Sequence, residues 1–375
     1  MKFTINSKVL TKVVSDLIKV IPNKTTLPIL TNILLELKGD LLRLTANDME
    51  ITMRGILKTD AAEGEAKVCI PARLLLDLLG TLPDGPVTFK RKDAKGIDTM
   101  VINWNNGSSN VPLFDEKDFP ETKTPGDEDP KFECNTDTIN EAISKTIFAV
   151  GHDDTRPALG SVYFDLNPGR SSIVACDQRR LACYDLETPD VKEPCSFMLP
   201  EKAAEIVKNT LPKDTAITIT FNNTCARFVY GNMEVNTRTV VGRYPKYREI
   251  IPKDNENVME TNREDLISTL KRMSVLAERK SVIARVKISA DGFQVNTEDT
   301  GLKMQGTETL PITYRGNEIN ICINIPSLVE VLSKIYSENV EIRLKDERKA
   351  MIVLPGSEDR EGEPYTALVM PYFIK

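Results

Sequence analysis

The segment VCIPARLLLDLL at 68–79 recurs twice later in the chain and decides how the whole sequence is organised. The later copies are FMLPEKAAEIVKNTLP at 197–212 and INIPSLVEVLSKI at 323–335. Their prolines follow Pro71 at intervals of 129 and then 126 residues. In each copy a short apolar run leads through the proline into an amphipathic stretch. Proline suits the first position of a helix, so we expect a strand followed by a helix that begins at each of the three prolines.

A second landmark recurs with the same period. It is an aromatic residue or methionine followed by proline, and it stands at Phe119-Pro120, Tyr244-Pro245 and Met370-Pro371, with spacings of 125 and 126 residues. Solenoid repeats run only about 20–50 residues, so this period indicates whole domains in tandem. The segments 120–132 and 251–261 are polar and contain proline, which is typical of domain boundaries. The 375 residues therefore predict three domains, at 1–122, 128–253 and 258–375.

Each of the three repeats opens with an amphipathic stretch behind an asparagine, the type of residue that caps a helix. The apolar residues expected on one face of the first helix are Val9, Leu10, Val13, Val14, Leu17 and Ile21, and those of the second are Ile139, Ala142, Ile143, Ile147 and Val150. Strand-like segments such as LLRLTAND at 41–48 follow. The expected fold class is α+β, with two helices packed on antiparallel sheets in every domain.

Composition excludes several classes of protein. The chain is 41% hydrophobic and 28% charged, which is ordinary for a globular protein, and its longest apolar runs are far short of the roughly 20 residues of a membrane span. The start MKFTINSKV has no apolar signal region, so we expect a cytoplasmic protein without membrane contact. Seven cysteines without a CxxC and a single histidine, His152, argue against a disulfide framework, a zinc site and a Ser-His-Asp triad. We expect neither metal nor cofactor.

The net charge of −6 means that binding to a phosphate backbone needs basic side chains gathered on one face. Lys8, Lys12 and Lys19 lie on the polar face of the first predicted helix at spacings of four and seven. Further basic residues begin, line or follow other predicted helices: Arg73, Lys202, Lys208, Arg263, Lys271, Arg272, Arg279, Lys280 and Lys334. These residues are either solvated helix faces or the lining of a nucleic-acid channel.

Several motifs in their order resemble the bacterial DNA polymerase III beta subunit family, the sliding clamps. They are MKFTI at 1–5, TLPIL at 26–30, IPAR at 70–73, ACDQRRL at 175–181, GRYPKYREIIP at 242–252 and LVMPYFIK at 368–375, and the resemblance covers essentially the whole chain. It implies a ring in which two head-to-tail protomers supply six domains around duplex DNA, with helices inside and sheets outside. The ring slides without sequence preference and holds the polymerase on DNA. Such a processivity subunit has no catalytic residues of its own, although the family is formally grouped with nucleotidyltransferases.

The resemblance also implies roles for particular residues. Lys24, Arg73, His152 and Lys202 are expected to face DNA, whereas Asp153 and Glu201 stand where their charge would repel phosphate. Contact between the second domain and DNA is therefore an open question at this stage. Val275 and Leu276 match the interface between the two protomers of the ring.

A second implied surface is a hydrophobic cleft that takes short linear peptides from replicative and other DNA polymerases, the clamp loader, and mismatch-repair and ligase-type proteins. Its matching residues are Leu159, Cys176, Arg180, Leu181, Pro245, Ile250, Asn324, Leu368, Val369, Met370 and Pro371. The family pattern is altered at Gln178-Arg179, Glu249, Ser327 and Tyr372-Phe373, so we expect the same floor with a changed rim.

Two other functions fit parts of the sequence. Pro83-Asp84 followed by Asp115-x-Lys117 has residue types of a metal-dependent nuclease, in which carboxylates hold Mg²⁺. The same residues are also typical of turns and polar loops, which is the simpler interpretation. A tandem-domain adaptor that never contacts DNA is the other alternative. Salt-dependent retention on circular but not linearised DNA distinguishes a clamp from such an adaptor.

Overall fold

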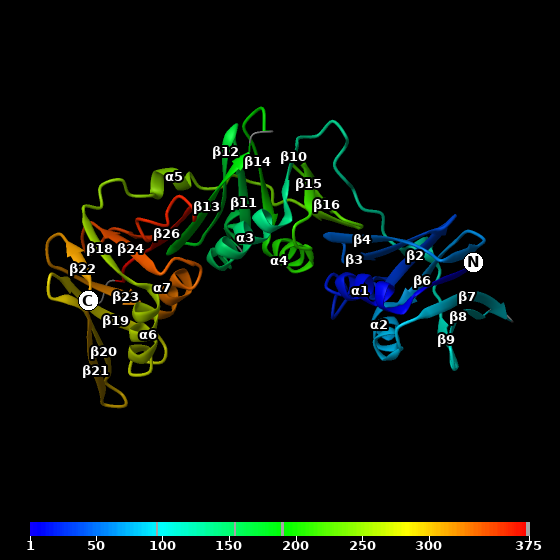
Figure 1. Cartoon of the computed structure of the whole chain (residues 1–375), viewed down its shortest axis with the longest axis horizontal. Coiled ribbons are helices and arrows are strands. Elements are labelled where there is room, and N and C mark those ends of the chain that lie inside the picture. Colours follow the sequence, from blue (N-terminus) through cyan, green and yellow to red (C-terminus); the bar gives the residue numbers. More distant parts are fainter. Residues whose placement is uncertain (95–96, 154, 189–190, 373–375) are drawn as a thin grey trace. The chain divides into compact units, whose positions relative to one another are not determined.

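The computed structural model describes residues 1–94, 97–153, 155–188 and 191–372. The chain forms two compact units, one of Met1–Asp137 with Glu205–Thr239 and the other of Thr138–Ala204 with Val240–Lys375. Each unit contains two antiparallel sheets with helices packed against them (Figure 1). Among the described residues, no helix is long and apolar enough to cross a membrane.

The first unit is built on an eight-stranded sheet and a five-stranded sheet. The larger sheet has the order β10 (Lys131–Asn135), β15 (Ala216–Phe221), β16 (Cys225–Tyr230), β17 (Met233–Arg238), β4 (Ile51–Lys58), β3 (Leu41–Asn47), β2 (Asn32–Lys38) and β6 (Ala66–Pro71). The smaller sheet has the order β5 (Ala61–Glu63), β1 (Lys2–Asn6), β7 (Pro86–Ala94), β8 (Ile97–Trp104) and β9 (Gly107–Pro112).

Strands from the first and second sequence repeats share the larger sheet. They meet where β17 pairs with β4, with Met233 opposite Gly55 and Thr237 opposite Ile51. Gly55 also allows a close approach from the side, because a Cβ there would lie 2.5 Å from Val13 Cγ1. The missing side chain therefore lets the first helix pack directly on the strand at which the two repeats join.

The two helices of this unit, α1 (Ser7–Leu17) and α2 (Ala72–Thr81), lie side by side against the larger sheet (Figure 1). The Asn6 side chain caps α1 by accepting hydrogen bonds from the amides of Lys8 and Val9. The expected apolar face is confirmed for five of its six residues: Leu10, Val13, Val14, Leu17 and, beyond the helix, Ile21 are buried. Val9 was placed wrongly, since it is 49% exposed.

The physical reason is that the buried face of α1 begins at Ser7, two residues before Val9. Ser7 is buried and donates its hydroxyl to the carbonyl of Pro83, so the face follows positions 7, 10, 14 and 17 and leaves position 9 outside. In the second repeat, Ile139, Ala142, Ile143, Ile147 and Val150 are all buried, as expected. The first three belong to α3 (Thr136–Thr146). Asn135 directly precedes this helix, and its side chain accepts the amide hydrogen of Asp137.

The recurrent prolines stand at the junction of strand and helix rather than at the first helical position. Pro71 ends β6 and is the N-cap of α2, and Pro200 ends β14 (Cys195–Pro200) directly before α4 (Glu201–Thr210). Only Pro326 lies inside a helix, in the first turn of α7 (Ile325–Leu332). Each of the first two prolines still has a strand partner, since Pro71 stands opposite Asn32 and Pro200 opposite Ser161. The strand thus extends one residue further than the sequence pattern predicts.

The second unit contains a nine-stranded sheet and a four-stranded sheet. The order of the larger one is β14, β11 (Ser161–Leu166), β12 (Gly169–Cys176), β13 (Arg180–Thr188), β26 (Tyr365–Val369), β25 (Met351–Pro355), β24 (Asn339–Leu344), β18 (Asn257–Asn262) and β22 (Thr313–Arg315). The smaller is β21 (Met304–Leu310), β20 (Gly292–Asp299), β19 (Ile283–Ser289) and β23 (Ile319–Asn324). Helices α6 (Arg263–Ser274) and α7 are in contact, and the one-turn helix α5 (Tyr247–Ile250) lies beside the larger sheet (Figure 1).

Strands of the second and third repeats share this nine-stranded sheet through the pairing of β13 with β26 (Figure 1).

In the same unit the Lys145 side chain is 1% exposed and forms an ion pair with Glu363. Its ammonium also lies 4.0 Å from the ring centroid of Tyr336. The Glu363 carboxylate in turn accepts the amide hydrogens of Tyr336 and Ser337. A buried charge needs partners of this kind, so the cluster joins residues from two repeats beneath the sheet.

Candidate binding cleft and basic surface

A cavity of about 390 Å³ opens on the nine-stranded sheet of the second unit. Its lining comes from the end of β12, the start of β13, helix α5, the residue before β25, and the end of β26 with the residue that follows it. The lining residues are Arg156, Leu159, Cys176, Asp177, Gln178, Arg179, Arg180, Leu181, Pro245, Ile250, Ala350, Leu368 and Met370. We call this cavity the cleft.

The structure brings most of the cleft residues expected from the sequence together. Eight of them line the cleft: Leu159, Cys176, Arg180, Leu181, Pro245, Ile250, Leu368 and Met370. Gln178 and Arg179, the altered rim residues, line it as well. Asn324, Val369 and Pro371 do not belong to this lining. Asn324 instead caps α7 by accepting from Ser327, while Val369 and Pro371 are buried.

Three lining residues were not anticipated. Arg156 stands in the loop before the short helix Pro157–Gly160, Asp177 follows β12, and Ala350 precedes β25. Asp177 carried a usable signal, because an aspartate just after a strand commonly shapes a turn. Arg156 and Ala350 carried none, since an exposed arginine and a single alanine are unremarkable in a sequence.

The floor of the cleft is formed by Cys176, Leu181 and Leu368, which belong to a row of apolar side chains that crosses four adjacent strands and ends beside the cleft at Ile352. Cys176 stands opposite Leu181, Leu181 opposite Leu368, and Leu368 opposite Ile352. All four are buried in one apolar cluster that also holds Leu159 and Tyr244. Side chains directly opposite on neighbouring strands lie about 4.5–5.5 Å apart at Cβ, so the row is continuous. Burial raises the pKa of the Cys176 thiol and of the Tyr244 hydroxyl, which keeps both uncharged at neutral pH.

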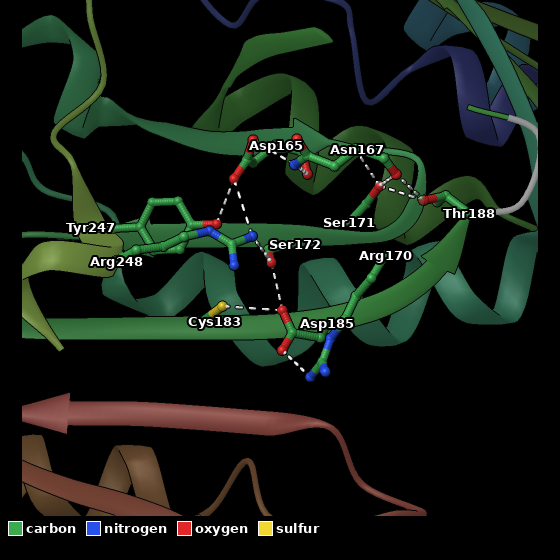
Figure 2. A network of polar contacts seen from close by, with 10 residues as sticks. All are labelled: Asp165, Asn167, Arg170, Ser171, Ser172, Cys183, Asp185, Thr188, Tyr247 and Arg248. Carbon is green, nitrogen blue, oxygen red and sulfur yellow. Dashed lines mark hydrogen bonds and ion pairs between the residues drawn. The ribbon is translucent and has the colours of Figure 1, made fainter. Parts of the chain in front are cut away.

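One wall of the cleft is helix α5, and a polar network holds it against the sheet (Figure 2). The Tyr247 hydroxyl donates to Asp165 Oδ2 at 2.6 Å, and Arg248 donates to the same oxygen at 3.4 Å. Arg248 also donates to Ser172, which itself donates to Asp185. Burial raises the pKa of Tyr247, as does the Asp165 carboxylate, so its hydroxyl stays a donor. The network fixes α5 from three strands, β11, β12 and β13, and so places Ile250 at the cleft.

The rim is organised by the Asp177 carboxylate. Its Oδ1 accepts the amide hydrogens of Arg179 and Arg180, both at 2.6 Å, and its Oδ2 accepts from Arg180 Nε at 3.0 Å. The rim continues into the residues after β26, where the Met370 amide donates to the Arg179 carbonyl at 2.8 Å. The Arg179 guanidinium lies 4.2 Å from the ring centroid of Tyr372. Phe373, which was expected to alter the rim, lies outside the described residues.

The residues expected to face DNA are exposed. In the first unit, Arg73 donates to the side chain of Asn23 at 2.6 Å, which brings it next to Lys24 in the chain. Lys8 and Lys12 are exposed on α1, and Lys19 bonds to Asp16 and to the carbonyl of Asn209. In the second unit, His152 is 75% exposed with its Nδ1 3.4 Å from Glu201, and Lys202 is exposed.

Two arginines of α6 serve the fold instead of standing free on a basic surface. Arg263 donates to the carbonyl of Ser337 and pairs with Glu264, and Arg272 forms a bidentate pair with Glu308. At the end of the same helix Val275 is 74% exposed, while Leu276 is partly buried. Leu276 rests on Gly306, where an added Cβ would lie 2.5 Å from its Cδ1. Of the two residues expected at an interface, Val275 is therefore the one available to a partner.

The residues of the nuclease alternative have structural roles. Asp115 caps a short helix through the Lys117 amide and also pairs with the Lys117 ammonium at 3.2 Å, and Asp84 accepts from Asn6. A second cavity, of about 610 Å³, is lined by polar residues including Glu260, Asp265, Glu358 and Asp359. In the described part of the chain, no group of three or more His, Cys, Asp or Glu residues could hold a metal ion.

Helices paired on antiparallel sheets, sheets shared between successive repeats, and an apolar cleft at one such junction define a three-domain clamp. Sequence models of three successive domains of one family match this chain. The N-terminal domain of the DNA polymerase III beta subunit matches residues 1–123, the central domain 133–246, and the C-terminal domain 248–372. The chain belongs to the DNA polymerase III beta subunit family, whose members are the non-catalytic processivity subunits of that polymerase.

Full-length relatives agree with this assignment. The beta sliding clamp of Pseudomonas aeruginosa is 25% identical over 99% of both chains, and that of Escherichia coli is 24% identical over 99% of both. The crystal structure of the Pseudomonas aeruginosa DNA polymerase III beta subunit superposes with a TM-score of 0.94 at 23% identity over the whole of both chains. That of Thermotoga maritima gives 0.90 at 22% identity, again over both whole chains. The expected α+β clamp fold is confirmed.

The anchoring of α5 leads to a first prediction. Tyr247→Phe removes the hydroxyl that donates a hydrogen bond to Asp165. A hydrogen bond to a charged group contributes about 1.5–3 kcal/mol to stability. We expect hydrogen exchange of the Tyr247, Glu249 and Ile251 amides to rise about tenfold or more through local opening. Arg170→Ala is the matched control, because Arg170 contacts only the exposed end of the network at Asp185. If hydrogen exchange is unchanged in Tyr247→Phe, the polar network does not hold α5 in place.

Proposed function

We propose that two copies of this chain close into a ring around duplex DNA and tether partner proteins through the cleft. The single observation that carries this proposal is the cleft itself, with a floor of apolar side chains from three paired strands and a rim of polar ones. A preformed apolar groove of this size suits two or three anchor side chains of an extended peptide. The three domains are proposed to span 1–122, 128–253 and 258–375.

The partners proposed for the cleft are DNA polymerases, the clamp loader, and mismatch-repair and ligase-type proteins, each through a short linear peptide. Such proteins share one attachment site by carrying similar apolar anchors, since the anchors supply most of the binding energy. A common site for several partners needs no catalytic group, and the uncharged Cys176 and Tyr244 fit a floor that binds without reacting. Because the similar beta sliding clamps come from bacteria, we propose that the protein acts in the cytoplasm.

DNA is proposed to pass the exposed basic residues of the helices and adjoining loops. Lys24 and Arg73 are the strongest candidates, because both are exposed and the Arg73 bond to Asn23 gathers them. Lys202 and His152 are weaker candidates, since Glu201 lies beside His152. Lysine and arginine contacts to phosphate carry no sequence information, which suits a ring that slides.

The ring is proposed to close head to tail, so that unlike surfaces meet at two identical interfaces. Val275 is the leading interface residue, because a valine 74% exposed at a helix end has apolar surface to bury. Leu276 supports it from below by packing on Gly306 of β21.

A second prediction tests the cleft. Changing both Leu181 and Met370 to Ala removes apolar surface from its floor and rim, so we expect partner affinity to fall by on the order of 2–4 kcal/mol. The probe is a labelled peptide of the type Gln-Leu-x-Leu-Phe, titrated into the parent and the variant, with circular dichroism to show that both are folded. Deleting the chain from Met370 onward should also abolish binding, but it removes the bond to the Arg179 carbonyl as well.

Leu302→Ala is the control for this experiment, because Leu302 is an exposed leucine of the same unit outside the cleft. Ring formation should survive in all variants. Equal peptide affinities for the parent and the Leu181, Met370 double variant would place the partner site elsewhere.

A third prediction concerns DNA. Lys24→Glu combined with Arg73→Glu should weaken binding to duplex DNA. The negative slope of log affinity against log salt concentration should become less steep by about two, one for each lost phosphate contact. Lys38→Glu with Lys90→Glu makes the same change in net charge at exposed sheet positions and should leave the salt slope as it is. If the two double variants behave alike, only the net charge of the protein matters and the two residues do not line the DNA path.

A fourth prediction concerns ring closure. Light scattering of the parent should give about twice the 41.9 kDa chain mass, and Val275→Asp should give a folded monomer because a buried, unpaired carboxylate is costly at an interface. Val241→Asp is the matched control, a valine 80% exposed elsewhere in the same unit. A dimer that persists in Val275→Asp would exclude this residue from the interface.

A further inference from the structure

The charges that line the cleft differ from those of the chain as a whole. The chain has 49 basic and 55 acidic residues, yet the cleft is lined by three arginines and one aspartate. The three arginines are Arg156, Arg179 and Arg180, and the aspartate is Asp177. A guanidinium at this rim that has no carboxylate partner attracts negative groups.

The charge of Arg180 is already balanced within the protein. Its guanidinium lies between Asp177 and Glu330, with distances of 3.0 Å and 2.5 Å to their carboxylate oxygens. Asp177 is also fully engaged, because it accepts the two rim amides as well. Arg180 is thus outweighed by its two carboxylate partners, so the positive charge at the rim comes from the other two arginines.

Arg179 is different, because it forms no ion pair with any residue in the described part of the chain. Its guanidinium instead lies over the ring of Tyr372, whose amide donates to the carbonyl of Cys322 in β23 of the four-stranded sheet. An aromatic face holds the flat guanidinium in place and leaves its edge N–H groups free to donate. The backbone of Arg179 is fixed on both sides, by Asp177 at its amide and by Met370 at its carbonyl.

Arg156 adds a second positive charge at the same rim. It is exposed, but the nearby Asp153 carboxylate, which accepts the hydroxyl and amide hydrogens of Thr155 at Oδ1, stays ionised and offsets part of this charge. Bonds from Thr155 are the main cause of the lowered pKa of Asp153, and the charge of Arg156 adds to the effect. Among the described residues, Arg156 makes no ion pair within 4.0 Å either.

We propose that the cleft selects acidic peptides, and that Arg179 is the residue that determines this preference. The proposal rests on the proposed peptide-binding function of the cleft and specifies its partner. The apolar floor binds the anchors of any such peptide, and Arg179 discriminates among them by a charge-assisted, bidentate hydrogen bond to an Asp or Glu side chain near the anchors. Its fixed backbone and stacked side chain reduce the entropy lost on binding.

The test uses the full-length chain and three labelled peptides with identical apolar anchors. The other positions carry Asp and Glu in the first peptide, Asn and Gln in the second, and Lys in the third. We expect the acidic peptide to bind about three- to tenfold more tightly than the amide peptide at low salt, and the Lys peptide to bind most weakly. The difference should shrink as salt is raised, since the rim is exposed.

Variants of Arg179 assign the preference. Arg179→Gln should make the acidic and amide peptides bind alike, and Arg179→Glu should reverse the order so that the Lys peptide binds best. Arg315→Glu makes the same charge change on an exposed arginine of β22, which β25, β24 and β18 separate from β26, and should preserve the order.

The outcomes separate this proposal from the function on which it rests. If the amide peptide binds and the acidic peptide binds no better, the charge preference is overturned while the cleft remains a peptide site. If the order persists in Arg179→Gln, Arg179 does not determine it. If none of the three peptides binds the parent chain, the proposed cleft function fails and this proposal with it.

Discussion

Two backbone ladders, β17 with β4 and β13 with β26, are the constraint on which the rest of the structure depends. A strand left at the edge of a sheet presents unpaired N–H and C=O groups, and the sheet must pair or cover it. In this chain the sheet strands of successive repeats pair with each other at those two places. The repeats are thus held by main-chain hydrogen bonds, which do not depend on the identity of the side chains. Relatives only 23–25% identical can therefore keep the same fold.

The second ladder also determines the chemistry of the cleft. Its register places Leu181 opposite Leu368, and the flanking ladders extend the row to Cys176 and Ile352. A slip of one residue would turn each of these side chains to the other face of the sheet. The pairing register therefore determines which apolar side chains form the floor. The rim is set by other means, namely the Asp177 carboxylate, helix α5 and the end of the chain.

Much of this architecture could be predicted from the sequence, because the period of about 125 residues, the asparagine caps and the apolar spacing are local signals. Val9, Pro71 and Pro200 were placed wrongly, since Ser7 and the last pair of two strand ladders compete with the simple helical pattern. The apolar cleft residues were predicted through the resemblance. Arg156 and Ala350 were not, because they reach the cleft only through the folding of loops that no periodicity describes. The roles of Lys24, Arg73, Val275 and Leu276 stay predictions, since they concern DNA and a second copy of the chain.

The position of β26 has a consequence for how the protein is made. It is the last strand of the described chain to leave the ribosome, yet it lies inside the nine-stranded sheet between β13 and β25. Domains fold during synthesis as their residues emerge, but this sheet stays open along β13 until β26 has been made. Leu368 and Met370 arrive at the same moment and finish the floor and the rim. A chain that lacks β26 and the residue after it therefore has no complete cleft.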